Sequence, residues 1–154
     1  MKKLVIALMV IGVVAFAGTS MAATQTSNLN VTAAVQAACS ISGHTDVAFG
    51  NYDPTSATDN DAGQGSMTFS CTKNTSYHTY ITGTRSMSGG GDTLNFQLYS
   101  DAGRTTAYPA ILTGGGTTAP NTNPITTNIY GRIPNSQNVG VANYTTILVA
   151  TIEY

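Results

Sequence analysis

Apolar and polar side chains alternate at every second position in several short stretches of the chain. The clearest stretch is 94–99, where Leu94, Phe96 and Leu98 alternate with more polar residues. This period is typical of a β-strand that buries one face. The strands that it predicts are 47–49, 67–72, 77–82, 94–99, 125–133 and 144–154.

Loops rich in glycine, proline and small polar residues separate these strands. They include 53–54, 59–65, 88–92 with its three consecutive glycines, and 114–124. Such residues favour turns, and after residue 22 no window has the period of an amphipathic helix. Short strands between regular turns predict an all-β fold, an antiparallel sandwich or barrel.

The first 22 residues have the pattern of a secretory signal peptide. Lys2 and Lys3 precede an apolar run over 4–17, and small residues stand at Ser20 and Ala22. The run is shorter than the roughly 20 residues that a membrane-spanning helix needs. We therefore expect cleavage before Ala23 and export of the mature chain.

A further alternating stretch follows the expected cleavage site. After the polar residues 23–28, four apolar residues recur at every second position, namely Leu29, Val31, Ala33 and Val35. One interpretation is the first strand of the chain's own sandwich. The other is a free extension that adds a strand to the exposed sheet edge of another molecule. The period alone does not decide between the two.

Composition and motifs narrow the classes of function. Charged residues make up 8% of the chain and the net charge is −1, so we expect no nucleic-acid partner, because such a partner requires a basic face. The chain has no Gly-x-Ser-x-Gly motif, no His-Glu-x-x-His motif and no phosphate loop. We expect no enzymatic activity and no cofactor.

The chain has two cysteines, Cys39 and Cys71. In an exported protein such a pair is expected to form a disulfide. The alternative is a metal site that adds His44 and His78, but the spacing matches no zinc pattern. We therefore expect the disulfide and no metal.

Two carboxylates, Asp59 and Asp61, stand close to Gly63 in a polar loop. This spacing occurs in calcium loops, but the later ligands and the bidentate glutamate are missing. A solvated turn is the expected structure.

Several motifs, in the same order along the chain, resemble the spore coat protein U domain. The resemblance covers 39–154, and the chain differs from the usual family pattern at Tyr108-Pro109 and at Thr146. The matching motifs are Cys39-Ser40-Ile41, Val47-Ala48-Phe49-Gly50-Asn51-Tyr52-Asp53, Leu98-Tyr99-Ser100-Asp101-Ala102-Gly103-Arg104-Thr105, Tyr130-Gly131-Arg132-Ile133-Pro134, Gln137, Tyr144 and Thr151-Ile152-Glu153-Tyr154.

The resemblance implies a subunit of an archaic chaperone–usher pilus. Its fold would be an incomplete immunoglobulin-like antiparallel sandwich that a donor strand completes. The organisation would be a signal peptide (1–22), a donor-strand extension (23–38) and a pilin domain (39–154). The donor face would be Leu29, Val31, Ala33 and Val35, and the chaperone would bind the C-terminal strand at Leu148, Ile152 and Tyr154.

The partners implied are other copies or related pilins in a head-to-tail polymer, a periplasmic chaperone and an outer-membrane usher. The protein would be exported through the periplasm to the cell surface and would support adhesion and biofilm formation. Two alternatives remain open. One is a spore or cell-surface coat protein. The other is a secreted carbohydrate-binding module with a tyrosine platform made of Tyr77, Tyr80, Tyr99 and Tyr108.

Overall fold

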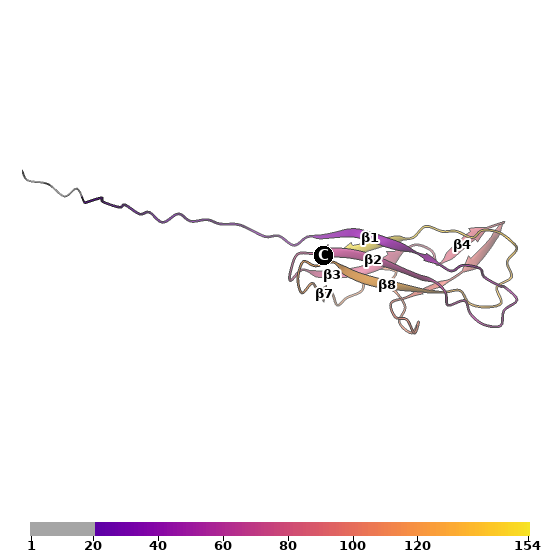
Figure 1. The fold of residues 1–154 in the computed structure, drawn as a ribbon. Coiled ribbons are helices and arrows are strands. Elements are labelled where there is room, and N and C mark those ends of the chain that lie inside the picture. Colours follow the sequence, from indigo (N-terminus) through magenta and orange to yellow (C-terminus); the bar gives the residue numbers. More distant parts are fainter. Residues whose placement is uncertain (1–20) are drawn as a thin grey trace, which may run out of the picture. The chain divides into compact units, whose positions relative to one another are not determined.

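The computed structural model describes residues 21–154 and has an all-β fold (Figure 1). The predicted signal peptide lies outside the described residues except for its last two positions. Residues 34–154 form one compact unit, and the stretch before it is not part of this unit. Within residues 21–154, no helix is long and apolar enough to cross a bilayer.

The described residues form nine strands in antiparallel sheets. One sheet has the order β1-β2-β8-β6, a second has the order β7-β3-β9, and β4 and β5 form a separate hairpin. The strands are β1 (Cys39–Ala48), β2 (Gln64–Cys71), β3 (Ser76–Thr82), β4 (Ser86–Gly89), β5 (Asp92–Asn95), β6 (Gln97–Tyr99), β7 (Thr117–Thr118), β8 (Ile125–Arg132) and β9 (Val149–Glu153).

Two apolar clusters fill the space between the sheets. Met67 and Phe69 of β2 contact Tyr77 of β3 in one cluster, which also includes Ile152 of β9 at its margin. The other cluster is centred on Phe49 and Phe96, whose ring centroids lie 5.8 Å apart. Because both clusters join inward-facing residues of different sheets, the fold is a sandwich. The all-β antiparallel prediction is confirmed.

The predicted disulfide is present. Cys39 and Cys71 are directly opposed on β1 and β2, and their sulfur atoms are bonded at 2.03 Å. The bond uses both thiols, so the alternative in which they ligate a metal is wrong.

The predicted strand 94–99 is interrupted at its centre. β5 ends at Asn95 and pairs with β4, whereas β6 begins at Gln97 and pairs with β8. Between them, the Phe96 amide donates to the Arg85 carbonyl at 3.0 Å. Leu94 and Leu98 are still both buried, so the inward alternation is correct although the chain changes sheets at Phe96.

Three other predicted boundaries are wrong. Residues 88–92 are not a plain loop, because Gly90 and Gly91, with φ of +60° and +91°, form the turn of the β4–β5 hairpin. The strand predicted at 47–49 overlaps the last two residues of the longer β1, and Phe49 lies just beyond it. The final strand begins at Val149 rather than at residue 144, because its partner β3 ends at Thr82 and Gly83 follows with φ of +118°.

Candidate strand-accepting groove

An apolar groove lies between two edge strands. Among the described residues, β1 pairs only with β2, and β9 pairs only with β3. The groove has a volume of about 510 Å³. It is lined by His44, Val47 and Phe49 on one side, by Leu148 and Ala150 on the other, and by Met67, Ile81, Leu98 and Ile129 between them.

Inward-facing residues of β1 are unusually exposed. Directly opposed residues of an antiparallel pair share a face, and Ile41 is opposite Phe69, which is fully buried. Ile41 therefore faces inward, yet 42% of its surface is exposed. His44, opposite the buried Met67, has a side chain that is 72% exposed. The inner face of β1 therefore lacks cover at its free edge.

The alternation along β9 separates an inner face from an outer one. Leu148, Ala150 and Ile152 pack against the apolar clusters. Ile147 and Val149 face away from them and are largely exposed. The second wall of the groove is therefore the inner face of β9 together with Leu148.

The backbone of Ala150 is directed to the open edge of β9. Its opposite residue, Ile81, donates its amide to the Pro109 carbonyl at 2.9 Å and accepts from Arg85 Nη2 at 2.8 Å. Both groups of Ile81 are thus bonded on the side away from β9, so Ile81 and Ala150 form a non-hydrogen-bonded pair. By the period of two, the N–H and C=O groups of Ala150 and Ile152 face the groove side and can pair with an added strand.

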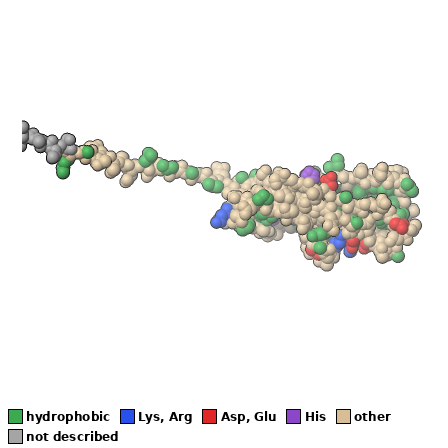
Figure 2. Space-filling view, in the orientation of Figure 1, with side chains coloured by type: hydrophobic (Ala, Val, Ile, Leu, Met, Phe, Trp, Pro, Cys, Tyr) green, Lys and Arg blue, Asp and Glu red, His purple; other side chains and the backbone are tan. Residues whose placement is uncertain are grey.

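The groove continues into a second cavity of about 750 Å³ beyond the end of β1. The two share Val47, Phe49, Met87, Tyr144 and Thr145. At this end of the domain, where Figure 1 labels β4, apolar side chains are visible on the surface (Figure 2).

The wall of the second cavity is held to the β4–β5 hairpin by hydrogen bonds. Ser88 and Thr145 exchange two backbone bonds of 3.1 and 3.2 Å. The Gly140 amide donates to Asp92 Oδ2 at 2.7 Å, and the Tyr144 hydroxyl donates to the Gly140 carbonyl at 2.8 Å.

The predicted donor face is exposed in the N-terminal stretch. Leu29 and Val31 are each 87% exposed and Val35 is 83% exposed. Residues 21–38 belong to no strand. Within the compact unit, the Ala38 carbonyl accepts from the Thr72 amide at 2.8 Å, and the Gln36 carbonyl accepts from Thr72 Oγ1 at 3.2 Å. Residues 36–38 therefore continue the line of β1 beside the end of β2.

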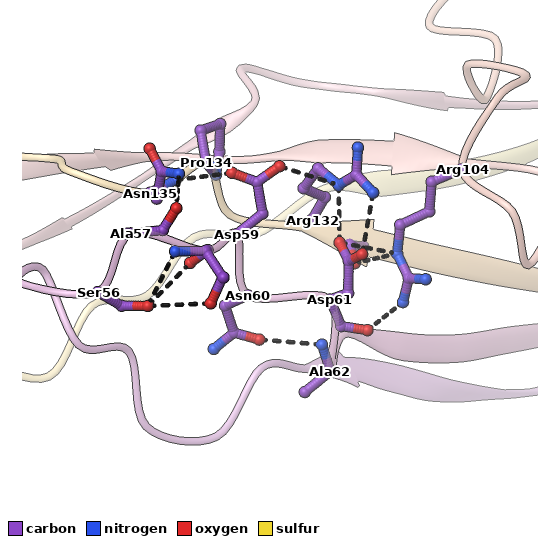
Figure 3. A network of polar contacts seen from close by, with 12 residues as sticks. Ser56, Ala57, Asp59, Asn60, Asp61, Ala62, Arg104, Arg132, Pro134 and Asn135 are labelled. Carbon is purple, nitrogen blue, oxygen red and sulfur yellow. Dashed lines mark hydrogen bonds and ion pairs between the residues drawn. The ribbon is translucent and has the colours of Figure 1, made fainter.

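Two acidic residues that the sequence places in a solvated turn also belong to a network with two arginines (Figure 3). Arg132 donates from Nε and Nη2 to the two carboxylate oxygens of Asp61, at 2.7 and 2.9 Å, and lies 3.5 Å from Asp59 Oδ2. Arg104 Nε lies 3.3 Å from Asp61 Oδ1 and donates to the Gly131 carbonyl at 2.9 Å. The hydrogen bond from Arg132 holds the pKa of Asp61 below its ordinary value.

This network holds the loop that connects β1 to β2. Asn60 exchanges backbone bonds with Ile133 of 2.8 and 2.9 Å, and its side chain donates to the Phe49 carbonyl at 3.2 Å. The four charged residues are visible in the sequence, but their pairing depends on β8 lying beside this loop. The loop is exposed as expected, with the side chains of Asp59 and Asp61 36% and 42% exposed, but the ion pairs with the arginines were not predicted.

The four tyrosines proposed as a carbohydrate platform do not gather on one exposed face. Tyr77 and Tyr108 are buried in different apolar clusters. The Tyr80 hydroxyl donates to Glu153 Oε2 at 3.1 Å, and Tyr99 lies under the guanidinium of Arg132. The platform prediction is wrong.

The three C-terminal residues predicted to contact a chaperone lie in different surroundings. Leu148 faces inward and lines the groove, whereas Ile152 faces inward and packs against the cluster around Met67 and Phe69. Tyr154 is 58% exposed and follows the end of β9.

A comparison with protein families agrees with the resemblance seen in the motifs. The model of a family described as the Spore Coat Protein U domain matches residues 25–151, which is most of the chain. The matched residues include the exposed N-terminal stretch as well as the sandwich. No curated protein matches the chain at a significant level.

Proposed function

Since the chain belongs to the Spore Coat Protein U domain family, we propose that it is a structural subunit of a surface pilus, in which the groove takes up residues 29–35 of a second copy. The observation that carries this proposal is the pair of free edges, β1 and β9, on either side of an apolar groove. An unpaired apolar edge promotes association and is normally covered. An added strand would bond to the free edge of β9 and cover the exposed inner face of β1.

Pairing between copies is favoured over pairing within one chain. The backbone of residues 36–38 is held beside β2 by Thr72. To enter its own groove, the extension would have to reverse direction at or before Gln36, which leaves Val35 in the turn. A second copy meets no such restriction, because its extension reaches the groove from outside.

Uptake of one copy's extension by the next generates a filament. The donor segment and the groove are different surfaces of the same chain, so the contact is head-to-tail and leaves a free groove at one end. The proposed role is structural rather than enzymatic, with adhesion and biofilm formation as the function of the filament.

The proposal includes a periplasmic chaperone and an outer-membrane usher. Before polymerisation, the groove and the free edge of β9 need a temporary strand, and Leu148, Ile152 and Tyr154 are the proposed chaperone contacts. The usher would then exchange the chaperone strand for the extension of the next subunit. This route takes the signal-bearing chain through the periplasm to the cell surface.

A coat protein is the second candidate, and the description of the matched family supports it. Such a protein would use the same sandwich in a surface layer without a chaperone. The two candidates differ in the linear polymer, which only the pilus requires.

The test is polymer formation in cells that export the chain together with a chaperone and an usher. Unheated denaturing gels should show a ladder at multiples of the subunit mass, and boiling should collapse it. Val31→Asp should abolish the ladder but leave the chaperone complex, because the charge would enter the apolar groove. Thr32→Asp is the matched control on the opposite face and should leave the ladder intact. Equal ladders from both variants, or none from the wild type, would contradict the proposal.

A further inference from the structure

We propose that the donor strand runs antiparallel to β9 in one register, with Ala33 opposite Leu148, Val31 opposite Ala150 and Leu29 opposite Ile152. This inference rests on the proposed function and adds the residues that select the donor. The Ala33–Leu148 pair is its decisive element.

The polarity follows from the ends of the domain. Cys39 and Ile152 belong to one apolar cluster, and Val47 and Leu148 belong to the other, so β1 and β9 run in opposite directions. In Figure 1 the C-terminus accordingly lies beside the start of β1. The chain's own residues 36–38 continue β1 at this end.

The domain of a second copy begins at Cys39, only four positions after its own Val35. It therefore lies at the end of the groove where Val35 lies. At the end near Cys39 it would meet the first copy's residues 36–38, whereas the opposite end is open at the second cavity. Val35 therefore lies near Tyr144 and Leu29 near Ile152, and the donor runs antiparallel to β9.

The free edge of β9 restricts the register to steps of two residues. The backbone groups of Ala150 and Ile152 face this edge, and their side chains face inward. In an antiparallel ladder the residues that exchange hydrogen bonds share a face. The inward-facing donor residues must therefore lie opposite inward-facing residues of the acceptor.

Side-chain size selects among these steps. In the proposed register the smallest donor residue, Ala33, lies opposite Leu148, and Val31 lies opposite the small Ala150. A shift of two residues in one direction sets Val31 against Leu148. A shift in the other direction sets Val35 against Leu148 and Ala33 against Ala150. Close packing favours a large residue opposite a small one, and both shifted registers lose this match at Leu148.

The register has a consequence for Val35. It places this residue opposite Thr146, which lines the groove next to Tyr144 and Thr145, where the groove meets the second cavity. The donor thus presents Val31, Ala33 and Val35 to the residues that line the groove, while Leu29 lies beyond them at Ile152.

Cysteine cross-linking in the exported, assembled protein tests directly which donor residue lies opposite Leu148. Opposed residues in a hydrogen-bonded antiparallel pair have Cα atoms about 5.5 Å apart, which suits a disulfide. Chains with Ala33→Cys and Leu148→Cys should form polymers that resist boiling without reductant. The matched control, Ala33→Cys with Ala150→Cys, is displaced by two residues and should not cross-link.

Exchanging the sizes of the side chains at positions 33 and 148 tests whether their packing selects the register. Ala33→Leu should reduce the polymer yield at least roughly tenfold, because overpacking against Leu148 is unfavourable. Adding Leu148→Ala should restore most of the yield, since the two side chains exchange sizes.

The outcomes separate the register from the function. If the wild type polymerises but the variant with Ala33→Cys and Ala150→Cys forms the cross-link, the register is wrong. Strand exchange itself would still stand. Undiminished polymers from Ala33→Leu would also overturn it. A wild type that forms no polymer with its chaperone and usher would overturn both proposals.

Discussion

Replacement of Ile41 by threonine should weaken donor binding without requiring any change in the donor. Ile41 faces inward on β1, but 42% of its surface is exposed. Fully burying an isoleucine side chain is worth about 1.5–3 kcal/mol, so covering the remaining surface is worth about 0.6–1.3 kcal/mol. Threonine keeps the β-branched shape and forfeits this gain, which corresponds to about a three- to ninefold weaker complex.

The assay uses the mature chain with Val31→Asp as an acceptor that does not polymerise. A labelled peptide of residues 23–37 serves as the donor, and its dissociation constant is measured by fluorescence anisotropy. Val149→Thr is the matched control, because Val149 is 59% exposed but lies on the outer face of β9. It should change the dissociation constant by less than about twofold, as surface substitutions usually do.

The result that would refute the reasoning is equal affinity for the Ile41→Thr and Val149→Thr acceptors. It would mean that the donor does not cover the inner face of β1. The donor would then not extend from the groove along β1 as far as Ile41.

Three further predictions concern the stability of the sandwich. Because the pKa of Asp61 is lowered in the folded state from its ordinary 3.8, its contribution is present above this value and lost in more acid solution. Denaturant midpoints should therefore fall less for Asp61→Asn than for the wild type between about pH 5 and pH 2. Cys39→Ser opens a disulfide that spans 32 residues, and the unfolding free energy should decrease by about 3–4 kcal/mol. Gly131→Ala places a methyl group 2.5 Å from the Phe49 ring and should cost about 1–3 kcal/mol, whereas Gly114→Ala meets no atom within 4 Å and should leave calorimetric stability unchanged.

Local alternation predicted most of the strands because each one buries a single face. Met67, Phe69, Cys71, Tyr77 and Ile81 are buried as the period of two requires, and Thr79 is half-buried. The pattern failed at Phe96, where alternation continues without interruption but the backbone changes partner. The alternation shows which side chains face the core. It does not show which neighbouring strand pairs with the backbone.

The candidate site was only partly readable from the sequence. The period of 29–35 predicted a strand with one apolar face but not what it pairs with, and the motifs indicated the family. The groove itself depends on β1 and β9 being edges of different sheets, which is a property of the topology. The pairing of Asp61 with Arg132 across 71 positions was equally invisible, because no local pattern relates the two residues.

Hydrogen exchange at the amides of β9 tests the central claim most directly. We would compare the Val31→Asp acceptor alone and with the peptide of residues 23–37, using NMR. The amides of Ala150 and Ile152 face the free edge, so the peptide should slow their exchange at least roughly a hundredfold, as new ladder bonds do when they open only with the complex. Those of Val149 and Thr151 bond to β3 and should be protected in both samples. Unchanged exchange at Ala150 and Ile152 in the peptide complex would contradict strand addition at this edge.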